Sequence, residues 1–184
     1  MQLVIENCEE QLSEWLWLEY RHCAEIWESI TFTNVRGGMK EKLATIGKVA
    51  EKSFEKLFEA EKLIILDPLA EEELKTPDFA DSKAVVIGGI LGCEIPEGRT
   101  SELITAKAKG AKIRNLGEKQ LTIDTAALVA KLIYLGAKLE DVEITRRIEV
   151  VHNENERTVL PYGYVVIEDK VIITPGLIDY LKLP

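Results

Sequence analysis

Three loops that directly follow short apolar runs carry the residue types from which a ligand pocket is built. They are Asp67-Pro68, Gly88–Gly92 and Leu116–Thr122. Glycine at the end of a strand lets the backbone approach a ligand and permits positive φ, and in open α/β sheets ligands bind beyond the carboxyl ends of the strands. Together the loops predict a pocket lined by backbone groups, although each loop alone would also serve as an ordinary turn.

The order of the glycines restricts the kind of ligand. The segment Gly88-Gly89-Ile90-Leu91-Gly92 lacks the GxGxxG order of dinucleotide-binding loops, and the sequence contains no GxxxxGK[ST] phosphate loop. We therefore expect an uncharged or zwitterionic ligand that is held by backbone groups.

A cluster of carboxylates lies near the N-terminus, at Glu9, Glu10, Glu14 and Glu19. Glu10 and Glu14 are four residues apart, a spacing that places two side chains near one face of a helix. Such carboxylates would orient a guanidinium group, which stays protonated in water, and offset its charge. The alternative is a solvated acidic helix start, which also suits the helix dipole.

Other polar residues carry weaker signals. Arg99 follows the glycine loop at the expected start of a helix, where it would contact an acidic group of a ligand or lie on the surface. The spacing of Cys8, His22 and Cys23 matches no zinc pattern, so we expect no metal site.

Alternating strand and helix patterns would position these loops. Strands are predicted at Leu3–Ile5, Ile30–Val35, Lys62–Leu66, Lys83–Ile87 and Lys112–Asn115, with strand-like segments at Glu143–Val150, Tyr164–Ile167 and Val171–Ile173. Helices are predicted at Leu12–Trp27, at Val49–Phe58, from Arg99, at Asp124–Leu135 and after Pro175. The alternation predicts an α/β fold with a largely parallel sheet.

Composition narrows the class of protein. The chain has 184 residues, of which 46% are apolar and 30% charged, as expected for one globular domain spanning residues 1–184. The net charge of -9 disfavours nonspecific binding to nucleic acid and favours a basic partner. The apolar runs are too short to span a bilayer, and the N-terminus lacks a signal-peptide pattern. Three cysteines indicate reduced thiols in a cytoplasm.

Spaced residues along the chain resemble one family. The central residues of this resemblance are Gly88–Gly92, Arg99-Thr100, Glu102-Leu103, Leu116-Gly117, Lys119-Gln120, Thr122 and Asp124-Thr125-Ala126. Leu66-Asp67-Pro68, Ser13-Glu14-Trp15 and Pro175-Gly176 extend it over nearly the whole chain. The sequence is similar to the SPOUT-class methyltransferases of the family that includes the yeast ribosomal-protein arginine methyltransferase and archaeal proteins described as predicted RNA methylases. Cys93 departs from the pattern, because the family can carry an acidic residue there.

The resemblance implies a fold, a cofactor and a set of site residues. The fold would be of the SPOUT type, with a trefoil knot in the C-terminal half, and the cofactor would be S-adenosylmethionine, bound as methyl donor. The donor-binding residues would be Asp67, Pro68, Gly88, Gly89, Ile90, Leu91, Gly92, Leu116, Gly117, Gln120, Leu121, Thr122 and Thr125. The residues expected to act in catalysis are Glu10, Glu14, Glu19 and Arg99.

Two methyl acceptors remain open at this point. The first is an arginine of a basic ribosomal or other RNA-associated protein, which suits the acidic cluster and the net charge. The second is RNA, the common acceptor across the SPOUT class, which would need a basic groove beside the glycine loops. A binding protein that keeps the knot without turnover is a third hypothesis. Because SPOUT enzymes are usually dimers, a homodimer is one alternative for the assembly.

Overall fold

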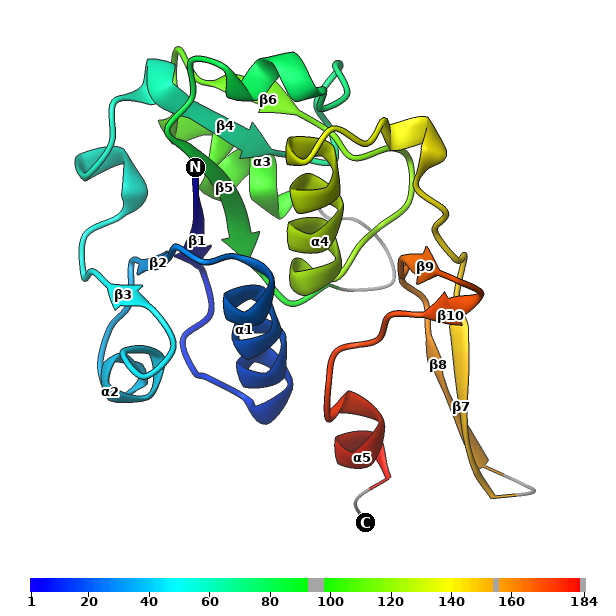
Figure 1. Ribbon diagram of the computed structural model, residues 1–184. Coiled ribbons are helices and arrows are strands. Elements are labelled where there is room, and N and C mark those ends of the chain that lie inside the picture. The colour runs from blue at the N-terminus through cyan, green and yellow to red at the C-terminus, as the bar shows by residue number, and fades with distance from the viewer. Residues whose placement is uncertain (93–97, 154–155, 183–184) are drawn as a thin grey trace.

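A computed structural model describes residues 1–92, 98–153 and 156–182 (Figure 1). Its main sheet is built from β1 (Gln2–Asn7), β2 (Ile30–Thr33), β3 (Lys48–Val49), β4 (Leu63–Leu66), β5 (Ala84–Gly89) and β6 (Lys112–Arg114). The six strands lie in the order β3-β2-β1-β5-β4-β6, and every pairing among them is parallel. The predicted α/β fold with a largely parallel sheet is therefore confirmed.

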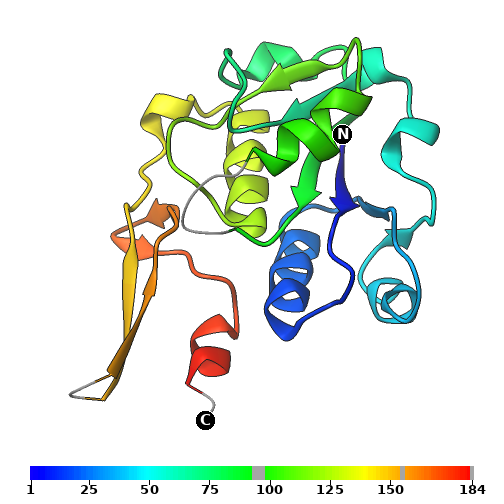
Figure 2. The ribbon, with the colours of Figure 1, turned by 180° about the vertical axis from the view of Figure 1, so that it is seen from behind.

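Helices cover both faces of this sheet. The helices are α1 (Glu14–Ile26), α2 (Met39–Leu43), α3 (Arg99–Leu103), α4 (Ile123–Tyr134) and α5 (Leu177–Leu181), of which α5 packs against α1 and the C-terminal segment instead of the sheet. Short 3-10 turns lie at Phe54–Lys56, Ala60–Lys62, Thr76–Phe79, Thr105–Lys107 and Leu139–Asp141. Helices α1 and α4 pack together on one face of the sheet, and α3 lies on the other (Figures 1 and 2).

The alternation of side chains along the central strand explains this layering. In β1, Leu3 and Ile5 belong to the core cluster under α1 and α4, whereas Val4 belongs to the cluster under α3. Successive side chains of a strand point to opposite faces, and all three are fully buried. A parallel sheet with both faces covered by helices is buried in this way on each side.

Side-chain caps set the starts of the two long helices. The Ser13 hydroxyl accepts a hydrogen bond from Leu16 N at the start of α1, and the Thr122 hydroxyl accepts one from Thr125 N at the start of α4. Such caps satisfy backbone N–H groups that have no partner within the helix. Both helices begin within two residues of their predicted starts, and α4 is largely buried, as its apolar sequence predicts.

The segment after α4 forms a separate hydrophobic cluster. An antiparallel hairpin of β7 (Ile148–Asn153) and β8 (Glu156–Leu160) projects from the body of the molecule, and β9 (Val166–Ile167) and β10 (Lys170–Val171) form a second small ladder (Figure 1). The cluster of buried residues consists of Val150, Leu160, Tyr162, Tyr164 and Leu177. Trp15 of α1 packs against this cluster and so links it to the main body.

The helix predicted at Val49–Phe58 is wrong. In this segment Ala50 N donates to Phe32 O and Val35 N donates to Ala50 O, so the chain continues beside β2 in an extended form. Only Phe54–Lys56 forms a 3-10 turn, which places Phe54 in the core. The apolar residues of this segment are spaced for burial under the sheet. Backbone hydrogen bonds beside β2 outweigh the tendency of the segment to form a helix.

Smaller differences concern the ends of elements. The strand-like segment predicted at Glu143–Val150 enters a regular strand only at Ile148, although Ile144 forms an isolated bridge with Val165. Elements α2, β3 and β8 were not predicted. Cys93 lies outside the described residues. The trefoil knot stays a prediction. Within the described ranges, none of the helices has the length and apolar character needed to cross a bilayer.

Candidate active site

A cavity of about 270 Å³ opens at the carboxyl ends of β4, β5 and β6 and is bounded by the first turns of α3 and α4. Its volume approaches the lower end of the range for small-molecule sites, roughly 300 Å³. The cavity is lined by all three of the loops singled out in the sequence: residues 66–69, the glycine loop and residues 116–123. All the predicted donor-binding residues except Gly89 and Thr125 line it.

The two exceptions have clear physical reasons. A Cβ on Gly89 would lie 2.0 Å from the Tyr20 hydroxyl, so this glycine faces α1 and lets that helix approach the sheet. Thr125 is buried and its hydroxyl lies 2.7 Å from that of Thr122, which does line the cavity. Gly89 and Thr125 therefore lie behind the residues that line the cavity.

The remaining glycines of the loop let the backbone lie close to neighbouring side chains. A Cβ on Gly92 would lie 2.8 Å from the Tyr162 ring, and one on Gly88 would lie 2.8 Å from Ile104. The Gly92 carbonyl accepts a hydrogen bond of 2.8 Å from the Tyr162 hydroxyl. At Gly92 the loop thus needs a residue without a side chain, whereas a side chain at Gly88 would require the ends of Ile104 and Ile90 to shift.

The second glycine-containing loop is shaped by backbone geometry as well. Gly117 has a φ of +87°, which favours glycine, and its N–H donates to the Asn115 side chain at 2.9 Å. Further along, the Gln120 carbonyl accepts a hydrogen bond of 2.8 Å from Gly163 N. The loop is therefore fixed at its start by a local turn and at its end by the C-terminal segment.

Asp67 contributes to the cavity wall with a carboxylate that is already engaged. It accepts hydrogen bonds from the hydroxyls of Ser101 and Thr105, at 2.7 and 2.6 Å, and from Leu69 N at 2.9 Å. The residue is buried. Its carboxylate therefore joins the loop after β4 to α3 and to the turn that follows α3.

Arg99 lies at the cavity edge and bridges two segments. Its guanidinium donates to Glu9 Oε1 at 3.0 Å and to Leu91 O at 3.3 Å, while Leu91 N also donates to Glu9 Oε1. Glu9 and Arg99 thereby clamp the glycine loop from the side of the N-terminal strand. The arginine remains one-third exposed and lines the cavity.

The other three predicted catalytic residues do not gather in one place. Glu10 lies before α1, which begins at Glu14, so the expectation that these two share a helical face is wrong. Glu10 is exposed and follows Glu9 in the sequence, whereas Glu14 is exposed and forms an ion pair with Lys42 of α2 at 3.5 Å. Glu19 is buried on the opposite side of α1, against α4.

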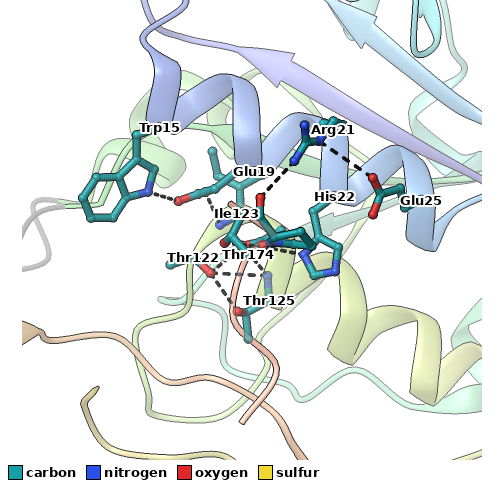
Figure 3. A network of polar contacts seen from close by, with 11 residues as sticks. Trp15, Glu19, Arg21, His22, Glu25, Thr122, Ile123, Thr125 and Thr174 are labelled. Carbon is teal, nitrogen blue, oxygen red and sulfur yellow. Dashed lines mark hydrogen bonds and ion pairs between the residues drawn. The ribbon is translucent and has the colours of Figure 1, made fainter. Parts of the chain in front are cut away.

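Glu19 belongs to a buried polar network behind the cavity (Figure 3). Its two carboxyl oxygens accept hydrogen bonds from the Trp15 indole N–H at 2.5 Å and from Ile123 N at 3.0 Å. Burial and the neighbouring Asp124 carboxylate raise the pKa of Glu19 to about 8, against the opposing effect of these two hydrogen bonds. Glu19 is therefore largely protonated at neutral pH and holds the first residue of α4.

Asp124 is the hub of the same network. One carboxyl oxygen accepts the Thr122 hydroxyl at 2.7 Å and Thr125 N at 2.9 Å, and the other lies 2.7 Å from His22 Nδ1 and accepts the Thr174 hydroxyl at 2.6 Å. Since Asp124 is 1% exposed, each of these contacts replaces a water.

Cys8, His22 and Cys23 form no metal site in the part of the chain that the structure describes. Among the residues that the structure describes, no group of three His, Cys, Asp or Glu side chains has the arrangement to hold a metal ion. His22 faces Asp124, and Cys23 is in the core. Burial and the charge of Glu6 raise the pKa of the Cys8 thiol to about 11, so it is protonated at neutral pH.

An acidic groove adjoins the cavity. We use this name for the hollow of about 680 Å³ that shares Pro68, Gly117 and Glu118 with the cavity lining. Its charged residues are Glu71, Glu72, Glu73, Asp78 and Glu118, with Lys75 and Arg114. Arg114 is bound by Asp78 at 2.8 Å and by Glu72 at 3.1 Å, so its charge is already compensated. The groove is consequently anionic next to the cavity.

Comparison with a distantly related structure concerns the fold. A Trm10 protein of Thermococcus kodakaraensis superposes with a TM-score of 0.58 over 77% of this chain and 96% of its own, at 14% identity. A likeness at this identity concerns the fold alone, which is that of the SPOUT methyltransferases.

Closer similarity defines the family. Residues 2–183 match the family described as "Protein arginine N-methyltransferase SFM1-like", and the chain belongs to this family. It is 32% identical to Protein arginine N-methyltransferase SFM1 of Saccharomyces cerevisiae over 99% of this chain and 94% of the yeast protein. The crystal structure of the yeast arginine methyltransferase SFM1 complexed with SAH has a TM-score of 0.90 at 30% identity, covering 98% of this chain and 94% of that chain. Another structure of the yeast enzyme is complexed with SAM, with a TM-score of 0.89.

Sequence reasoning did not identify all the residues that shape this site. Tyr162 contacts the glycine loop and Thr174 contacts Asp124 at the start of α4, and the sequence analysis assigned a role to neither residue. The acidic groove was missed as well, although the run Glu71-Glu72-Glu73, which follows Asp67-Pro68 after two residues, was a visible signal for it.

Proposed function

We propose that this chain transfers the methyl group of S-adenosylmethionine to an arginine of a basic protein. The cavity would hold the donor, with backbone groups of Gly88–Gly92 and Leu116–Thr122 around it and Asp67 and Pro68 in its wall. The relatives of known structure are complexed with SAM and SAH, and the cavity is lined by nearly all the residues that the resemblance assigns to the donor.

The chemistry requires little more than alignment. A lone pair of a guanidinium nitrogen forms a bond to the methyl carbon while the carbon–sulfur bond breaks, and its electrons go to sulfur. The products are a methylated guanidinium, a neutral thioether and one released proton. Holding acceptor and donor in line supplies most of the rate enhancement in such a displacement. Of the three predicted acceptor carboxylates, Glu19 is buried and Glu14 is paired with Lys42. Glu10, in contrast, is exposed beside Glu9, which binds Arg99 of the cavity lining, and Glu10 is therefore our candidate to receive this proton.

The observation that carries the choice of acceptor is the acidic groove. It opens directly beside the donor cavity, and its carboxylates exceed its cations. A segment rich in Arg or Lys would be attracted by this field, whereas RNA phosphates would be repelled. The groove therefore supports a basic protein, such as a ribosomal or other RNA-associated protein, over the RNA alternative.

The first test offers both acceptors to the enzyme. Radiolabelled donor is incubated with purified basic ribosomal proteins and, in parallel, with RNA. We expect label in protein that is recovered as methylarginine after hydrolysis. Label only in RNA would reject the proposal.

A second test removes charge from the groove. Replacing Glu71, Glu72 and Glu73 by Gln should raise the KM for a basic protein roughly tenfold, because each lost exposed ion pair contributes up to about 1 kcal/mol. The effect should shrink at high salt. The matched control replaces Glu25, Glu28 and Glu41, three exposed residues outside the groove, and removes the same net charge. Equal KM changes in both triple variants would show that the groove has no special role.

A further inference from the structure

The C-terminal segment contacts both of the loops that form the donor cavity. At the glycine loop, the Tyr162 hydroxyl donates to the Gly92 carbonyl at 2.8 Å. At the second loop, Gly163 N donates to Gln120 O at 2.8 Å, and Gly163 forms a bridge with Leu121. A third contact lies behind the cavity, where the Thr174 hydroxyl donates to Asp124 at 2.6 Å.

The contact at Gly92 is close enough to set the position of the loop. The Tyr162 ring leaves no space for a Cβ at Gly92, since the distance would be 2.8 Å. Tyr162 is 9% exposed and belongs to the hydrophobic cluster of the C-terminal segment, with Leu160 and Leu177. The ring is thus held by its own packing and does not depend on the loop for its place.

The contact at Thr174 acts on the start of α4. Asp124 also accepts hydrogen bonds from the Thr122 hydroxyl and Thr125 N, and Thr122 and Ile123 line the cavity. The C-terminal segment is fixed independently here as well, because Arg21 of α1 donates to Pro175 O at 3.0 Å. Figure 3 shows Thr174 and Thr122 within this network.

We propose that residues 161–177 form a positioning element of the donor cavity, in which Tyr162 holds the glycine loop and Thr174 holds the start of α4 through Asp124. This inference rests on the proposed function, because it concerns the affinity for the donor. The two contacts act on two different segments of the cavity lining, the glycine loop and the start of α4. Losing either contact lets a wall move and lowers the fraction of molecules that are ready to bind the donor.

The test compares affinities for S-adenosylhomocysteine, measured by calorimetry at one temperature below the unfolding transition. Tyr162→Phe and Thr174→Val should each raise its Kd five- to tenfold, and the double variant should raise it further. Thr174→Ser keeps the hydroxyl and should bind as the unchanged protein does. In turnover assays the KM for the donor should rise in the same proportion, with kcat at saturating donor changing less than twofold.

A matched control separates positioning from general loss of stability. Thr33 is buried like Thr174, and its hydroxyl also donates to a buried carboxylate, that of Glu6, at 2.6 Å. Thr33 does not line the cavity. Thr33→Val should therefore lower the unfolding midpoint as Thr174→Val does, while leaving the Kd unchanged.

Each outcome decides the question. Unchanged Kd values in both Tyr162→Phe and Thr174→Val, or an equal rise in Thr33→Val, would overturn the positioning role and leave the proposed function standing. If Thr174→Val fails to fold, Tyr162→Phe and Thr174→Ser still provide the comparison. Absence of binding by the unchanged protein would overturn the proposed function and, with it, this inference.

Discussion

Replacing Glu19 by Gln tests the account of the buried network behind the cavity. The pKa of Glu19 is raised from 4.5 to about 8 by burial and by Asp124. The folded protein therefore holds this proton more tightly than the unfolded chain does. The resulting contribution to stability is fully present below pH 4.5 and is lost as the pH rises through 8.

The size of the effect follows from the two pKa values. Between pH 6 and pH 9, ionisation of Glu19 should lower the free energy of unfolding by about 3 kcal/mol. Gln at this position has no such titration. It has only one oxygen for the two donors, Trp15 Nε1 and Ile123 N, so it leaves one buried donor unpaired at a cost of about 1–3 kcal/mol at every pH.

The measurement is urea unfolding of both proteins at pH 6, 7, 8 and 9. At pH 6 the Gln variant should be the less stable protein, and the difference should disappear or reverse by pH 9. Glu25→Gln, on an exposed position of the same helix, should keep the pH profile of the unchanged protein. Parallel profiles for Glu19→Gln and the unchanged protein would refute the assignment of a raised pKa to Glu19.

The remaining predictions concern the glycine loop and its clamp. Gly89→Ala should lower the free energy of unfolding by about 3 kcal/mol, because its Cβ would lie 2.0 Å from the Tyr20 hydroxyl; Gly38→Ala, with nothing within 4 Å, is the control, and equal unfolding midpoints would contradict the prediction. Arg99→Lys should weaken S-adenosylhomocysteine binding severalfold in calorimetry, because one ammonium group cannot bind Glu9 and Leu91 O together as the forked guanidinium does. An unchanged Kd would show that the contacts of Arg99 do not hold the glycine loop in place.

Local patterns in the sequence were sufficient for the scaffold of the site. Short apolar runs that end in Asp67-Pro68, in glycines or in Leu116-Gly117 predict strand ends, and the carboxyl ends of parallel strands meet at one edge. The apolar run at Asp124–Leu135 predicts α4, and the structure adds the Thr122 cap, which needs only neighbouring residues. These features depend on interactions within a few residues.

The parts that were not predicted depend on contacts between distant residues. Glu14 and Glu19 are close in sequence, but Glu14 pairs with Lys42 and Glu19 binds Ile123 N, and no local pattern specifies these neighbours. The segment Val49–Phe58 has helical spacing, yet backbone pairing beside β2 determines its conformation. Tyr162 and Thr174 reach the cavity only because the C-terminal segment returns to it.

The groups around Asp124 are far apart in the sequence, and this separation determines how late in synthesis their contacts can form. Asp124 is joined to His22, 102 residues earlier, and to Thr174, 50 residues later, while Arg21 and Pro175 are 154 residues apart. Contacts of such range form slowly, since long loops must close first. During synthesis, the carboxylate stays incomplete until residue 174 has left the ribosome. We therefore expect the methyl donor to bind only after residue 174 has been made, so that chains that end before it remain inactive.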